Sequence, residues 1–157
     1  MHACKCGFFG DTTRECRCTP GQIQQYLGKI SGPLLDRIDI HVEVPAVPYK
    51  ELRGPDTSES SADMRVRIEA ARDVQQVRGY YNSRMPTRMI RKQCELDDSG
   101  ERTLEMAVRR MGLSARAHDR VLKVARTIAD LGGSSQVTAK HVAEAVQYRS
   151  LDRNYWN

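Results

Sequence analysis

The chain has 157 residues, 39% of them hydrophobic and 29% charged, and a formal net charge of +5. This length fits one ordinary domain or two small ones, and no run of about 18 apolar residues is present that could span a membrane. Because the N-terminus lacks the charged-then-apolar pattern of a secretion signal, we expect a cytoplasmic protein whose five cysteines are thiols or metal ligands rather than disulfides.

The N-terminal segment contains four cysteines in a C-x-C-x9-C-x-C pattern: Cys4, Cys6, Cys16 and Cys18. Two close pairs on a short loop can converge on one tetrahedral Zn²⁺, and four sulfur ligands leave no open position, so such a site would be structural. Paired zinc ligands are usually separated by two residues rather than one, so four reduced thiols remain the alternative. His2 is a further ligand candidate.

A short helix is predicted next. The stretch "TPGQ" at 19–22 favours a helix start, because Thr19 can cap the helix, Pro20 suits its first turn and Gln22 can reach back to complete a capping box. The helix is expected to end near Gly28.

The segment 38–44 is predicted to form a half-buried strand, since apolar and polar residues alternate along it. Arg37 therefore lies where a helix or turn passes into a strand. Its neighbours Asp36 and Asp39 could hold its guanidinium in place, and a plain Arg-Asp surface pair is the alternative to any functional role for Arg37.

Residues 44–61 contain three prolines and several small polar residues, which is typical of a linker. Everything after this linker has helical patterns, expected over 61–78, 87–94, 99–111, 114–131 and 138–149. Thr87 is expected to cap the second of these helices, and Cys94 to lie in the core. One buried stripe is predicted along the fourth, formed by Ala117, Val121, Val124, Ile128 and Leu131.

Basic residues gather in the window 82–126, which holds 11 Lys and Arg against 6 Asp and Glu. Two explanations of this excess are equally open. The window is a solvated helical surface, or it contacts the phosphate of a nucleotide or of a nucleic-acid backbone.

Two long blocks carry a family resemblance. "CKCGFFGD…ECRCTPGQIQQYLGKISGPLLDRIDIHVEVP" and "GLSARAHDRVLKVARTIADLGGSSQVTAKHVAEAVQYRSLDR" resemble the magnesium-chelatase-like AAA+ ATPases of the ComM/YifB type. The resemblance implies a mostly α fold. Residues 1–45 would be the last part of an AAA+ α/β core with a cysteine knuckle, residues 46–60 a linker, and residues 61–157 a helical lid domain.

The same resemblance implies roles for particular residues. Arg37, in "SGPLLDRID", matches the arginine finger that reaches the nucleotide of the neighbouring subunit, where its planar fork can spread over phosphate oxygens. Arg116 matches the second-sensor arginine of the lid, and Arg120, one turn on, could share that nucleotide-binding role. A solvent-facing arginine is the alternative for both. His2 stands where the family usually has an asparagine, so no sensor role is assigned to it.

The family further implies a ring, usually hexameric, that uses ATP and Mg²⁺ and acts on DNA in its branch-migration members. The sequence contains no G-x-x-x-x-G-K-[ST] phosphate loop, so the chain resembles a C-terminal fragment that should not hydrolyse ATP alone. Two alternatives are a structural or oligomerisation module and a subunit of a metal-inserting chelatase.

Overall fold

The structure is a computed structural model that describes residues 2, 4–11, 14–42, 44, 47, 53–54 and 58–149. Most of the predicted linker 46–60 and the last residues of the predicted lid, 150–157, lie outside the described residues. The described part is mostly α, as predicted. Its helices are α1 (Pro20–Leu27), α2 (Gly32–Leu35), α4 (Ser61–Val77), α5 (Thr87–Gln93), α6 (Asp98–Met111), α7 (Ala115–Leu131) and α8 (Ala139–Gln147), with a 3₁₀ turn η1 (Asn82–Arg84).

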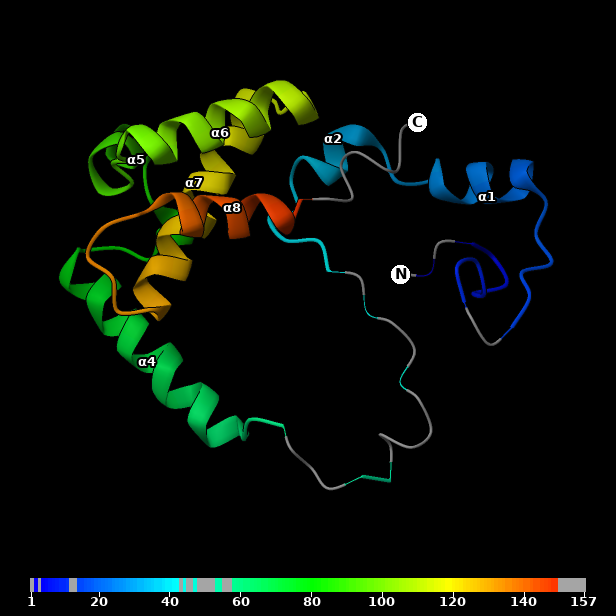
Figure 1. Cartoon of the computed structure of the whole chain (residues 1–157), viewed down its shortest axis with the longest axis horizontal. Helices are drawn as coiled ribbons and strands as arrows, with labels where there is room; N and C mark the ends of the chain where they lie inside the picture. Colours follow the sequence, from blue (N-terminus) through cyan, green and yellow to red (C-terminus); the bar gives the residue numbers. More distant parts are fainter. Residues whose placement is uncertain are drawn as a thin grey trace.

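The helices α4 to α8 form a bundle around α7, which packs against α4, α5, α8 and η1, while α6 packs against α8 (Figure 1). The cysteine loop and α1 lie on the side of the molecule away from α4, and α2 lies between α1 and the bundle. Apolar side chains from α5 to α8 and the segments beside them fill one core: Met85, Ile90, Cys94, Leu104, Val121, Leu122, Ala125, Ala129, Val137, Val142 and Ala145. Cys94 is therefore a core residue, as predicted.

Helix starts follow the sequence signals closely. Thr19 and Gln22 form the predicted capping box of α1. At α5 the prediction is wrong by one residue: Pro86 occupies the cap position and makes no side-chain cap, whereas Thr87 is already helical. The fixed φ of proline suits this position, and its missing N–H costs nothing at a helix start.

The strand predicted over 38–44 is wrong for the described residues, none of which has strand structure there. A strand needs a neighbouring strand to pair with. Among the described residues of this segment, the backbone hydrogen bond to a distant part of the chain runs from His41 N to Tyr148 O (2.7 Å), and Tyr148 lies in the turn after α8. The alternating apolar side chains are exposed instead: Ile38, Ile40, Val42 and Val44. The alternating pattern predicts an apolar face, but it does not show whether a neighbouring strand is present to pair with the segment and bury that face.

The buried stripe of α7 was predicted only in part. Ala117 and Val121 are buried, but Val124 and Ile128 are half-buried and Leu131 is exposed. The buried face includes Leu122, Ala125 and Ala129 instead. Small alanines let neighbouring helices approach α7 closely, so a helix surrounded on several sides buries residues that a single-stripe reading leaves out.

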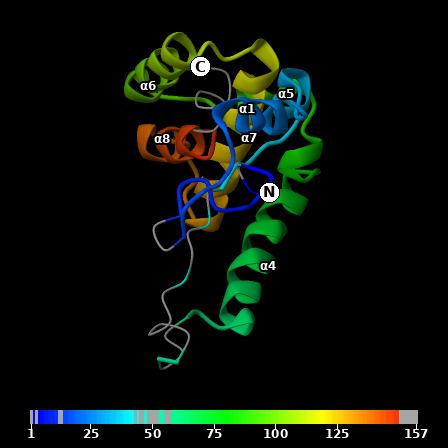
Figure 2. The ribbon, with the colours of Figure 1, turned by 90° about the vertical axis from the view of Figure 1, so that its right-hand side faces the viewer.

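The N-terminal half of α4 projects past the bundle in both views (Figures 1 and 2). All ten residues from 61 to 70 are exposed. Among the described residues, no helix is both long enough and apolar enough to cross a membrane.

Candidate functional site

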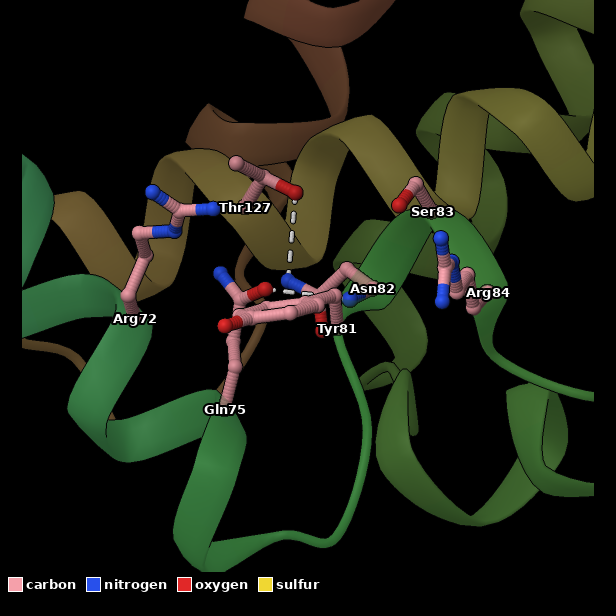
Figure 3. Close-up of a pocket in the computed structure, with 7 residues that line it drawn as sticks. All are labelled: Arg72, Gln75, Tyr81, Asn82, Ser83, Arg84 and Thr127. Atoms are coloured by element: carbon pink, nitrogen blue, oxygen red, sulfur yellow. Dashed lines mark hydrogen bonds between the residues drawn. The ribbon is translucent and has the colours of Figure 1, made fainter.

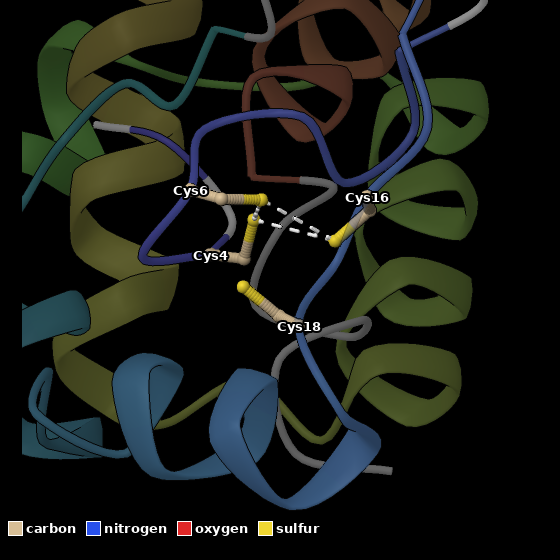
Figure 4. A group of neighbouring side chains, drawn as sticks. All are labelled: Cys4, Cys6, Cys16 and Cys18. Atoms are coloured by element: carbon tan, nitrogen blue, oxygen red, sulfur yellow. Dashed lines mark hydrogen bonds between the residues drawn. The ribbon is translucent and has the colours of Figure 1, made fainter.

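The four N-terminal cysteines come together in space. Their Sγ atoms all lie within 4.8 Å of one another, and the sulfurs of both pairs point toward a common centre (Figure 4). Cys4 Sγ lies 3.3 Å from Cys6 Sγ and 3.7 Å from Cys16 Sγ, and Cys6 and Cys16 are 3.6 Å apart. The cluster combines a tight turn at residues 4–7 with the extended segment that leads to α1.

This arrangement fits a tetrahedral metal ion. Zinc–sulfur bonds of about 2.3 Å place the four sulfurs of such a site about 3.8 Å apart, close to the separations found here. The thiols of the cluster differ in how readily they ionise. The Phe8 N–H and the Cys4 thiol lower the pKa of Cys6 to about 6. The Cys18 N–H favours the Cys16 thiolate, but partial burial and the neighbouring sulfurs outweigh it and raise the pKa of Cys16 to about 12.

A divalent cation would remove the repulsion that keeps neighbouring thiols from ionising together. The four cysteines can therefore hold a metal. His2 is exposed and does not belong to this ligand group.

Arg37 lies in the turn that follows α2. Its side chain is exposed, and the hydrogen bond it makes among the described residues runs from Nη1 to the Pro33 carbonyl (3.3 Å). Pro33 belongs to α2, so the guanidinium folds back along the helix that precedes its turn.

The neighbouring aspartates do not hold Arg37, contrary to the expectation. Asp36 accepts a hydrogen bond from Ser114 Oγ (3.1 Å) and lies 3.9 Å from Arg149 Nη2. Asp39 pairs with Arg120. Both carboxylates thus point toward the helical bundle, because their partners lie on α7 (Ser114 and Arg120) and just after α8 (Arg149).

Arg116 and Arg120 lie in the first two turns of α7. Arg116 is exposed and carries no ion pair among the described residues. Arg120 is half-buried and shares its charge with Asp39. Since Ser114, the N-cap of α7, bonds to Asp36, the start of α7 and the Arg37 turn lie side by side.

A polar pocket of about 440 Å³ opens between α4, η1 and α7 (Figure 3). Arg72 and Arg84 lie at its two sides, and neither has an ion-pair partner within the described part of the chain. The Arg72 guanidinium stands 5.1 Å above the centre of the Tyr81 ring. Lys123 also approaches this region, with Nζ 3.5 Å from the Ser83 carbonyl.

Sequence reasoning missed the residues that fasten the Arg37 turn. Ser114 is readable as a helix cap, and Arg149 follows an amphipathic helix, but no local signal connects either residue to Asp36 or Ile38. Arg149 and Ile38 are 111 positions apart.

Comparison with known proteins gives two family matches. The family described as "Magnesium chelatase, subunit ChlI C-terminal" matches residues 58–149, and "Magnesium chelatase, subunit ChlI" matches residues 1–52. The chain is 42% identical over 139 residues to competence protein ComM of Haemophilus influenzae. The aligned region covers 87% of this chain and 27% of that protein. It is 44% and 43% identical to the uncharacterized YifB proteins of Salmonella typhimurium and Escherichia coli, each over 87% of this chain and 28% of the relative. The chain thus spans just over a quarter of the length of these curated relatives.

Proposed function

The chain belongs to the magnesium chelatase ChlI family, and from this membership we propose that it is the C-terminal part of a ring-forming AAA+ ATPase that processes DNA in the cytoplasm. In this proposal residues 1–45 complete the ATPase core, residues 46–60 are a linker and residues 61–157 form the lid. The ring, a hexamer, binds ATP and Mg²⁺ through residues of the longer protein.

Arg37 is the proposed arginine finger, acting on the nucleotide of the neighbouring subunit. The observation that carries this assignment is an exposed guanidinium on a turn whose flanking aspartates are both occupied elsewhere. A permanent positive charge on such a fixed base can stabilise the charge that develops on a transferring phosphoryl group.

Arg116 is the proposed lid sensor for the γ-phosphate. Its position in the first turn of α7 adds the positive end of the helix dipole to its own charge. Arg120, which forms an ion pair with Asp39, remains the second nucleotide-binding candidate.

The finger assignment is tested by Arg37→Ala in the longer protein. We expect ATP hydrolysis to fall by about 10³-fold or more, the scale of a lost arginine finger, while ATP binding stays within a factor of two or so. The matched control is Arg65→Ala, which removes an exposed arginine from the projecting half of α4. Normal turnover in Arg37→Ala would refute the assignment.

The cysteine cluster is the proposed site of a structural Zn²⁺, which would cross-link the loop ahead of α1. Elemental analysis of protein purified without added metal should find one zinc per chain. Thiol titration of the folded, zinc-loaded chain should then find almost no reactive group, because the remaining thiol, Cys94, is buried in the core. Cys6→Ser should abolish metal binding and Cys94→Ser should leave it unchanged. Four freely reacting thiols and no metal in the folded chain would contradict the proposal.

A further inference from the structure

Arg149 is a charged residue in an unusual place. It follows Tyr148, the C-cap of α8, and its side chain is only 1% exposed. A buried guanidinium is strongly destabilising unless polar groups satisfy it. Here Nη1 donates to the carbonyl of Ile38 (2.8 Å), and Nη2 lies 3.9 Å from Asp36 Oδ1. The two contacts fall on the residues immediately before and after Arg37.

The backbone beside Arg149 makes a second attachment to the same segment. The carbonyl of Tyr148 accepts the N–H of His41 (2.7 Å), and His41 is buried. The end of α8 therefore holds the segment at Ile38 and at His41, three residues apart.

The helix α7 holds the opposite side of the turn. Ser114 Oγ donates to Asp36 Oδ2 (3.1 Å), and Arg120 pairs with Asp39. These contacts are more exposed than that of Arg149, and exposed ion pairs contribute little to stability. Arg149 is the partner that is fully removed from water, so it should dominate.

We propose that Arg149 is the positioning residue of the Arg37 turn: it binds the main-chain carbonyl of Ile38 and faces the Asp36 carboxylate, and so couples the place of the Arg37 guanidinium to the end of α8. A shift of α8 relative to α2 moves the turn with it, because the hydrogen bonds from the end of α8 reach main-chain atoms, the Ile38 carbonyl and the His41 N–H. The catalytic part of the inference rests on the proposed role of Arg37. The attachment itself does not.

The attachment is tested on the 157-residue chain by hydrogen exchange. In Arg149→Met the amide of His41 should exchange about tenfold faster or more, the scale expected when a charge-assisted hydrogen bond to a neighbouring carbonyl is lost. Amides inside α6 should not change. Arg149→Lys, which keeps the charge but has no planar fork, should be intermediate.

Two further variants keep this test decisive. Arg109→Met removes an exposed arginine of α6, with a side chain 79% exposed, and should leave His41 unaffected. Should Arg149→Met fail to fold, Asp36→Asn serves in its place. This substitution removes the carboxylate that faces Arg149, and the Asp36 side chain is 38% exposed, so the fold should tolerate the change. Exchange at His41 should become several-fold faster. Unchanged exchange at His41 would overturn the inference.

In the longer protein, a positioning role predicts a divided effect on kinetics. Arg149→Met should lower kcat for ATP hydrolysis about tenfold or more with KM for ATP nearly unchanged, and Arg149→Lys should recover part of the loss. Faster His41 exchange with unaltered kcat would overturn the coupling to catalysis. If Arg37→Ala alone left hydrolysis intact, the finger assignment would fall while the exchange result would still decide the attachment.

Discussion

Asp130 shows at the scale of one residue how this bundle accommodates charge in its interior. Its carboxylate is fully buried and accepts hydrogen bonds from Arg78 (2.6 and 3.1 Å), Asn82 (2.7 Å) and Arg126 (3.0 Å). Arg126 in turn donates to the Ser135 carbonyl (2.9 Å). One acid thus joins α4, η1 and α7. Arg78 also donates to Asn82 Oδ1 (2.9 Å), so both guanidiniums have a further oxygen acceptor besides Asp130.

Replacing Asp130 by alanine should therefore be severe. It leaves two largely buried guanidiniums without their shared acceptor, and breaking such a pair costs about 3–5 kcal/mol. Urea unfolding followed by circular dichroism should show this loss in the free energy of unfolding. Asp119→Ala, on the same helix, removes a carboxylate that is 33% exposed and that pairs with His118 in the described part of the chain. It should change stability by less than about 0.5 kcal/mol. Equal effects of the two substitutions would contradict the role given to Asp130.

At the scale of elements, the sequence predicts those features whose cause is local. The capping residues and the periodicity of the apolar residues predicted α1 and α4 to α8 to within a few residues. The cysteine cluster was also predictable, because its two pairs are close in sequence. The strand over 38–44 and the buried face of α7 were not, since each depends on which distant element packs there. The same holds for Arg149, whose partner is fixed by the fold alone.

The start of α6 carries a pH-dependent contribution to stability. Asp97 caps this helix by accepting the N–H of Gly100 (2.8 Å), and this bond, followed by those from Ser99, lowers the pKa of Asp97. A depressed carboxyl pKa stabilises the fold above the unfolded-state pKa of about 4, and that stabilisation is lost as the pH falls through the folded-state value.

Asp97→Asn should accordingly lower the Tm at neutral pH, and the difference from the unmodified chain should shrink as the pH falls below about 4. Thermal unfolding at a series of pH values measures this. Asp98→Asn is the matched control, since its carboxylate lies in the first turn of α6 but makes no hydrogen bond to it among the described residues. A difference in Tm that is constant from neutral to acidic pH would show that charge on Asp97 plays no part.

At the scale of the whole molecule, the basic residues divide into internal and external ones. Arg126 is buried and paired with Asp130, so the positive charge of the window 82–126 is not all available to a partner. Arg78, just before the window, is paired with the same carboxylate. Arg72 and Arg84 are different, because they face solvent at the pocket between α4, η1 and α7 without an ion-pair partner in the described part of the chain. This pocket is where the proposed contact with DNA phosphates is best supported.

Salt-dependent binding of single-stranded DNA to this chain tests that contact. We expect affinity to fall steeply between low and physiological salt, because each neutralised phosphate releases condensed counterions. Arg84→Ala should weaken binding across all sequences and reduce the slope of log affinity against log salt by about one. Arg65→Ala, on the projecting half of α4, should change neither. Weak binding that does not depend on salt would instead favour a structural or oligomerisation module, because the basic window would then be only a solvated face.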